Sequence, residues 1–151
     1  AIYRTHISID PEKGWEKGSY HSKGALQCYH ELYSDIYRWM KEGWIDYVVP
    51  QVYFPFERAD VTYHDITLWW ANITKETNTK LYTGNAIYQM GVQDKPEWSN
   101  PDEIKNQLTF NSNFENVKGS IFFTFKDFFE GENEIKNKAL ATIKELWNQN
   151  K

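Results

Sequence analysis

One stretch of this chain constrains its architecture more than any other: Gly43-Trp44-Ile45-Asp46-Tyr47-Val48-Val49-Pro50-Gln51-Val52-Tyr53-Phe54. A glycine suited to the left-handed position after a helix is followed by an apolar and aromatic run typical of a buried strand. In α/β folds ligands bind at the carboxyl ends of the strands. We therefore expect Gln51, Tyr53 and Phe54 to lie at a functional site.

Runs rich in β-branched or aromatic residues predict four strands, over residues 2–9, 45–54, 80–87 and 119–125. Apolar stripes at helical spacing lie between or after them, within residues 29–40, 66–73 and 135–147. A further helix is predicted to begin at Ser99-Asn100-Pro101-Asp102-Glu103, where a capping side chain, a first-turn proline and acidic residues coincide. This alternation predicts an α/β fold of four βα units with parallel strands.

The number of strands limits what this sheet can form. Four parallel strands make a small open sheet, whereas a (β/α)8 barrel needs eight. The runs Tyr47-Val48-Val49 and Ile121-Phe122-Phe123 are continuously apolar, as expected when both faces of a sheet are covered. We therefore predict one partial domain over residues 1–151, equivalent to half of such a barrel.

The composition narrows the classes of function. The 151 residues are 40% apolar and 25% charged, which is typical of a globular chain, and no apolar run is long enough to span a membrane. A net charge of -4 without a basic stripe argues against nucleic acid as a partner. The single cysteine, Cys28, cannot form an internal disulfide, and no histidine pair has the spacing of a metal site. Because no phosphate loop or dinucleotide fingerprint is present either, we expect no cofactor.

A series of segments, in this order, spans most of the chain: Lys23-Gly24-Ala25-Leu26-Gln27, Tyr33-Ser34-Asp35-Ile36-Tyr37-Arg38-Trp39, Gly43-Trp44-Ile45-Asp46-Tyr47-Val48-Val49-Pro50-Gln51-Val52-Tyr53, Trp69-Trp70, Leu81-Tyr82-Thr83-Gly84-Asn85-Ala86-Ile87-Tyr88, Trp98-Ser99-Asn100-Pro101-Asp102-Glu103-Ile104 and Val117-Lys118-Gly119-Ser120-Ile121-Phe122-Phe123. Together they resemble the glycosyl-hydrolase-10-like domain of bacterial surface lipoproteins. The resemblance covers the C-terminal half of that domain, which implies the C-terminal half of a TIM (β/α)8 barrel.

The resemblance implies a fragment of a bacterial glycoside hydrolase. Its substrate would be a cell-envelope or extracellular glycan, such as peptidoglycan or another amino-sugar polymer, and its location would be extracellular or at the cell envelope. The acidic pair of the family follows a middle strand upstream of everything present here. The fragment is therefore expected to be inactive alone.

Glycoside hydrolysis ordinarily uses two carboxyl groups ~5 to 9.5 Å apart. Carboxylates follow each predicted strand: Asp10, Glu12, Glu57, Asp60, Asp94, Asp127 and Glu130. Asp10 and Asp127 are the predicted catalytic acids, because each directly ends a strand and the last inward residue of a barrel strand reaches the ligand. The alternative for any of these residues is a solvated surface charge.

A second group of residues is predicted to bind substrate. Amide and ammonium groups at strand ends can donate hydrogen bonds to sugar hydroxyls, and flat rings can stack on sugar faces. Ser8 has the same strand parity as Asp10 and is expected to face the same side. The predicted substrate-binding residues are Ser8, Gln51, Tyr53, Phe54, Asn85, Tyr88 and Lys126.

Two other classes of protein remain open. A noncatalytic carbohydrate-binding or scaffold module would use the same aromatic residues without an acid pair. A small flavodoxin-like domain would need a phosphate loop after the first strand, and Asp10-Pro11-Glu12-Lys13-Gly14-Trp15 does not resemble one. A half-barrel would also leave two sheet edges and an apolar inner face open, which predicts a homodimer or larger assembly.

Overall fold

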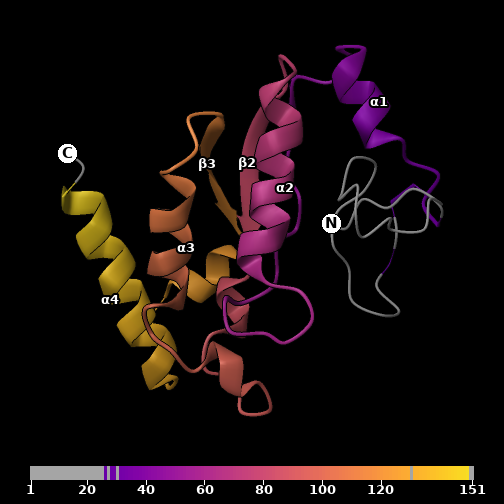
Figure 1. Ribbon diagram of the computed structural model, residues 1–151. Coiled ribbons are helices and arrows are strands. Elements are labelled where there is room, and N and C mark those ends of the chain that lie inside the picture. The colour runs from indigo at the N-terminus through magenta and orange to yellow at the C-terminus, as the bar shows by residue number, and fades with distance from the viewer. Residues whose placement is uncertain (1–25, 27, 30, 130, 150–151) are drawn as a thin grey trace.

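The computed structural model describes residues 26, 28–29, 31–129 and 131–149 (Figure 1). The predicted first strand, residues 2–9, lies outside this part of the chain, and so do Ser8 and Asp10. The described strands are β1 (Tyr47–Val48), β2 (Lys80–Asn85) and β3 (Val117–Phe122). They form one parallel sheet in the order β1-β2-β3, which confirms the predicted α/β fold with parallel strands.

Helices separate the strands. The α-helices are α1 (Ile36–Lys41), α2 (Tyr63–Lys75), α3 (Glu103–Asn111) and α4 (Glu134–Gln149), and the 3-10 helices are η1 (Ile87–Gln89), η2 (Pro96–Trp98) and η3 (Phe125–Phe128). In Figure 1, α2 and α3 lie side by side in front of β2 and β3, and α4 lies beside α3. This arrangement matches part of a (β/α)8 barrel, in which helices cover the outer face of the strands.

The pairing register divides the sheet into two faces. Val48 is aligned with Leu81, and both are buried under the helices. On the opposite face Tyr47 and Phe123 expose 59% and 56% of their surface. We call this second surface, formed by Tyr47, Tyr53, Tyr82, Ile121 and Phe123, the aromatic face. The prediction that both faces are covered therefore holds for only one face within the described part of the chain.

The helix-covered face carries the core. Its two apolar clusters are packed by α2 on one side and by α3 and α4 on the other. Trp98, Ile104 and Ile143 are almost fully buried, and each such side chain contributes ~1.5 to 3 kcal/mol relative to an exposed position. The apolar stripes predicted within residues 66–73 and 135–147 are thus the faces that α2 and α4 bury, except at the end of α4, where Trp147 exposes 45% of its surface.

The first predicted helix is much shorter than its apolar stripe. Tyr33 has a φ of 51°, a left-handed conformation that interrupts a right-handed helix. The Asp35 carboxylate then accepts a hydrogen bond from the Arg38 amide at 3.1 Å and caps a helix that begins only at Ile36. Gly43 follows this helix with a φ of 68°, as its sequence position predicted.

The strand predicted over residues 45–54 is also interrupted. Only Tyr47–Val48 form a regular ladder, and pairing resumes at a single parallel bridge between Gln51 and Gly84. Pro50 has no amide hydrogen to donate, although its carbonyl oxygen accepts from the Gly84 amide at 2.8 Å. The chain therefore keeps its course beside β2 as far as Val52, whose amide donates to the Gly84 carbonyl at 2.9 Å.

Candidate functional site

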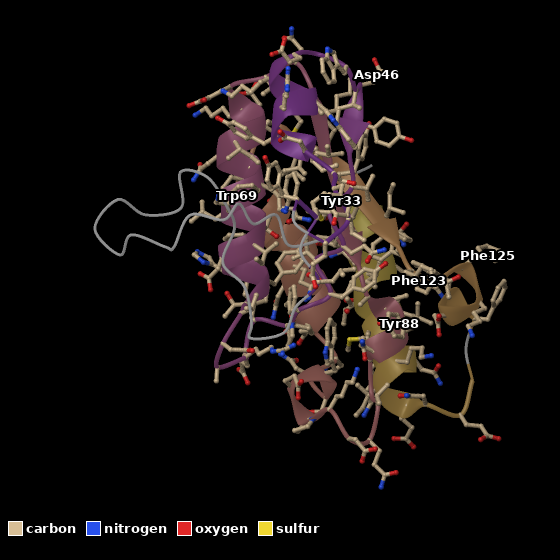
Figure 2. The ribbon with its side chains drawn as sticks, turned by 90° about the vertical axis from the view of Figure 1, so that its right-hand side faces the viewer. Tyr33, Asp46, Trp69, Tyr88, Phe123 and Phe125 are labelled. Atoms are coloured by element: carbon tan, nitrogen blue, oxygen red, sulfur yellow. The ribbon has the colours of Figure 1, made fainter. Side chains whose placement is uncertain are left out.

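Three aromatic rings meet where the strands end. Tyr53 follows β1, Tyr88 follows β2 and Phe123 follows β3, so all three lie at the carboxyl edge of the sheet. Their ring centroids are 5.9 Å apart for Tyr53 and Tyr88, 6.2 Å for Tyr53 and Phe123, and 5.8 Å for Tyr88 and Phe123. We call these residues the aromatic triad. Figure 2 shows Tyr88 and Phe123 on the opposite side of the sheet from Trp69 of α2.

The two hydroxyl groups of the triad, on Tyr53 and Tyr88, are influenced by neighbouring side chains and by burial. Burial, and then the neighbouring Tyr88, raise the pKa of the Tyr53 hydroxyl, which stays protonated and able to donate at neutral pH. The Tyr88 hydroxyl accepts a hydrogen bond from Gln89 Nε2 at 2.8 Å, and Gln89 Oε1 accepts from Lys95 Nζ at 2.6 Å. The triad is thus an apolar surface with an oriented hydroxyl group at its border.

Gln51 reaches the same surface because of a glycine on the next strand. It is exposed and shares a face with Gly84, its bridge partner. A Cβ atom on Gly84 would lie 2.9 Å from the Pro50 carbonyl oxygen and 3.3 Å from the Gln51 Cα atom. Only glycine permits this close approach of the two backbones. The predicted position of Gln51 beside Tyr53 at the strand ends therefore depends on Gly84.

Asn85 lies on the other face. Its side chain is fully buried beneath the helices. Its amide nitrogen donates to the Tyr63 hydroxyl at 3.1 Å and to Gln107 Oε1 at 2.8 Å, and its amide oxygen accepts from Thr83 Oγ1 at 3.0 Å. A contact between Asn85 and a sugar would require these buried bonds to break, and the predicted binding role stays untested.

Phe54 and Lys126 also lie apart from the triad. The half-buried Phe54 ring packs against the core cluster under α2, and the Arg58 guanidinium lies 5.4 Å from its centroid. Lys126 is exposed within η3, directly after β3. The structure therefore brings together Gln51, Tyr53 and Tyr88 of the predicted binding residues, and it places the other described ones elsewhere.

Asp127 is held by two partners. Its side chain is buried, and Oδ1 accepts a hydrogen bond from Lys136 Nζ at 2.8 Å. Oδ2 accepts from the Thr124 amide at 3.3 Å as part of a capping box at the start of η3. The predicted catalytic role of Asp127 remains a prediction, and both of its carboxylate oxygens already accept hydrogen bonds from within the fold.

Sequence reasoning missed Phe123, Gln89 and Lys95. Phe123 could have been found, because it follows an apolar run at the point where that strand ends. Within the described residues no group of three or more His, Cys, Asp or Glu side chains is placed to hold a metal. None of the helices in that part of the chain combines the length and apolar character needed to cross a membrane.

A parallel sheet with helices packed on one face is an α/β fold consistent with half of a (β/α)8 barrel. Comparison with known families identifies the family of this chain. The family described as glycosyl hydrolase-like 10 matches residues 4–100, and the chain belongs to this family. This confirms the resemblance inferred from the segments between Lys23 and Phe123.

Two curated relatives give the same result. The chain is 35% identical over 126 residues to glycosyl hydrolase DigH of Escherichia coli strain K12, a match that covers 78% of this chain and 29% of that protein. It is 36% identical over 121 residues to glycosyl hydrolase YngK of Bacillus subtilis strain 168, covering 80% of this chain and 24% of that protein. The chain thus spans less than a third of the length of either relative.

Proposed function

We propose that this chain is part of a glycoside hydrolase that acts on an extracellular or cell-envelope glycan, with an amino-sugar polymer such as peptidoglycan as the substrate class. Membership of the glycosyl hydrolase-like 10 family supports the reaction class, and the relatives carry that activity in their names. On this proposal residues 1–151 form one partial domain, and the enzyme works outside the cytoplasm.

The aromatic triad is the observation that carries the proposal. Sugar rings have apolar faces, and aromatic side chains offer large, flat apolar surfaces on which such faces can stack. Rings from the ends of three strands form one surface, beside which Gln51 and the Tyr88 hydroxyl can form hydrogen bonds with sugar hydroxyls. We assign substrate binding to this surface, with Gln51, Tyr53 and Tyr88 as its contacts.

Catalysis by this chain alone is not part of the proposal. Asp10 and Asp127 remain the candidate acids, and Asp127 Oδ1 forms an ion pair with Lys136 Nζ at 2.8 Å. The missing proton donor would come from the part of the relatives that this chain does not span.

A titration with an N-acetylglucosamine hexamer tests the binding proposal. Tyr53→Ala and Tyr88→Ala should each weaken binding about tenfold, the effect of ~1.4 kcal/mol. Trp44→Ala is the control, because Trp44 is also a large aromatic side chain, exposed at 61%, but precedes β1 at the opposite edge of the sheet. Loss of binding in the control, or unchanged binding in both tyrosine variants, would remove the proposed site.

A noncatalytic carbohydrate-binding module remains the second candidate, because the carboxylate of Asp127 is already committed to Lys136 and Thr124. Asp127→Asn in the full-length protein separates the two functions. The rate of peptidoglycan cleavage, measured by the appearance of reducing ends, should fall strongly if Asp127 takes part in the reaction. Unchanged cleavage would leave this residue a structural role only.

We also propose that the chain self-associates through the open edge of the sheet or through the aromatic face. Exposed apolar side chains outside the aromatic triad, Tyr47 and Ile121, support this assembly. Light scattering after size-exclusion chromatography measures the molar mass directly. A monomer of 18.0 kDa at high protein concentration would contradict it.

A further inference from the structure

A buried polar pair lies behind the candidate site, on the first turns of α3. Glu103 and Gln107 are one helical turn apart, and they expose 3% and 0% of their surface. Gln107 Nε2 donates a hydrogen bond to Glu103 Oε1 at 2.8 Å. Burial raises the pKa of the Glu103 carboxyl, which means that desolvation of this charge is unfavourable at this position. An apolar pair would fill such a position at a lower cost, so the polar contacts of the pair need an explanation.

Those contacts lead to the loop that carries Tyr53. Glu103 Oε1 accepts a hydrogen bond from the Phe56 amide at 3.0 Å, and Gln107 Nε2 donates to the Phe54 carbonyl at 3.3 Å. Both backbone groups lie within three residues of Tyr53. Strand pairing of this segment is described only as far as Val52. Beyond that residue the two side chains of α3 hold the loop through its backbone.

The same pair also reaches the end of β2. Gln107 Oε1 accepts from Asn85 Nδ2 at 2.8 Å, and Asn85 precedes Tyr88 by three residues. Gln107 thus joins the segment that bears one triad ring to the segment that bears the next. Buried groups of this kind cannot exchange a lost partner for water, so the bonds hold both segments in one arrangement.

We infer that Glu103 and Gln107 are positioning residues for the substrate-binding surface, holding the loop after β1 and the end of β2 so that Tyr53 and Tyr88 meet. They contact no substrate and act only through the backbone and Asn85. This inference rests on the proposed function for its effect on glycan binding, whereas the fastening of the loop stands independently of any ligand.

The test compares two readouts in the 151-residue chain. Amide hydrogen exchange at Phe56, followed by nuclear magnetic resonance, reports directly on the bond to Glu103. Titration with the N-acetylglucosamine hexamer reports on the surface. Glu103→Ala should accelerate exchange at Phe56 and weaken binding about tenfold, since small displacements of positioned groups have large effects. Glu103→Gln keeps an acceptor oxygen on a side chain of the same length, so its Phe56 exchange rate and hexamer affinity should match those of the wild type.

Asn116→Ala is the matched control. Asn116 Nδ2 donates to the Ala71 carbonyl at 2.6 Å and to Thr74 Oγ1 at 2.8 Å, so this variant also loses two hydrogen bonds to a helix. It precedes β3, at the opposite edge of the sheet from the triad. It should lower stability while leaving hexamer binding and the Phe56 exchange rate unchanged. Should Glu103→Ala fail to fold, Gln107→Met removes the amide that joins the Phe54 carbonyl to Asn85, at nearly constant volume. It should weaken hexamer binding as Glu103→Ala does, and unchanged binding in folded Gln107→Met would overturn the inference.

The outcomes separate this inference from the proposed function. The inference is overturned if the Phe56 amide of folded Glu103→Ala exchanges at the wild-type rate. It is also overturned if Asn116→Ala weakens hexamer binding as much as Glu103→Ala does. If wild-type protein does not bind the hexamer, the proposed function fails, and accelerated Phe56 exchange still supports the fastening of the loop. If Tyr53→Ala weakens binding and Glu103→Ala does not, the site stands without the positioning role.

Discussion

Replacing Gly84 with alanine should destabilise the protein through a single steric conflict. The added Cβ atom would lie 2.9 Å from the Pro50 carbonyl oxygen and 3.3 Å from the Gln51 Cα atom. Both neighbours belong to the backbone, so no side-chain rotation can relieve the contact. The chain on the β1 side must move away from β2, and it carries Gln51 and Tyr53 with it.

The magnitude follows from opposing effects. Overpacking of this kind costs ~1 to 3 kcal/mol. The shift also weakens the Gly84 amide to Pro50 carbonyl bond of 2.8 Å and the Val52 amide to Gly84 carbonyl bond of 2.9 Å, and each such bond contributes ~0.5 to 1.5 kcal/mol. Alanine lowers the conformational entropy of the unfolded chain, which stabilises the folded state by ~0.4 to 1 kcal/mol. The net loss of unfolding free energy should therefore be about 1 to 3 kcal/mol.

Urea unfolding at 25 °C measures this loss, and Gly131→Ala is the control, because nothing lies within 4 Å of a Cβ atom at Gly131. The control should be as stable as the wild type or slightly more stable. Gly84→Ala should also weaken hexamer binding, since it displaces Gln51 and Tyr53. A Gly84→Ala protein as stable as the control would refute the steric reasoning.

Further predictions concern charge and hydrogen bonding. Because burial raises the pKa of Glu103, the folded state holds this proton more tightly than the unfolded state. Stability should therefore be lost as pH rises above the ordinary glutamate pKa of ~4.3 and through the raised folded pKa, and Glu103→Gln should flatten that slope in urea denaturation. Asn116→Ala should cost about 1 to 2 kcal/mol in urea unfolding. Lys41→Ala removes an exposed ion pair with Glu76 and should leave the thermal midpoint unchanged.

Local signals in the sequence were predictive. Gly43 lies in the left-handed conformation expected of it, and α2 and α4 bury the apolar stripes that predicted them. Such features depend on residues within one or two helical turns. The parallel α/β fold follows from them, because alternating strands and helices leave few other topologies.

Features that depend on pairing between distant segments were less accessible. Asn85 is the last residue of β2, two residues before the predicted end of this strand, and the register with Phe122 turns its side chain toward the helices. A strand's two faces cannot be assigned from parity until one neighbour is fixed. Asp127 is different, because Thr124 stands three residues before it at the spacing of a capping box, which the sequence alone could have indicated.

The central place of β2 has a consequence for biosynthesis. Val48 pairs with Leu81, and Leu81 with Val117, so each strand finds its neighbour only after an intervening helix has been translated. The strands are synthesised in the same order in which they lie in the sheet, β1-β2-β3. The edge of β2 that pairs with β3 therefore stays open until β3 leaves the ribosome. During that interval unpaired amides and carbonyls are available to chaperones and to other copies of the chain.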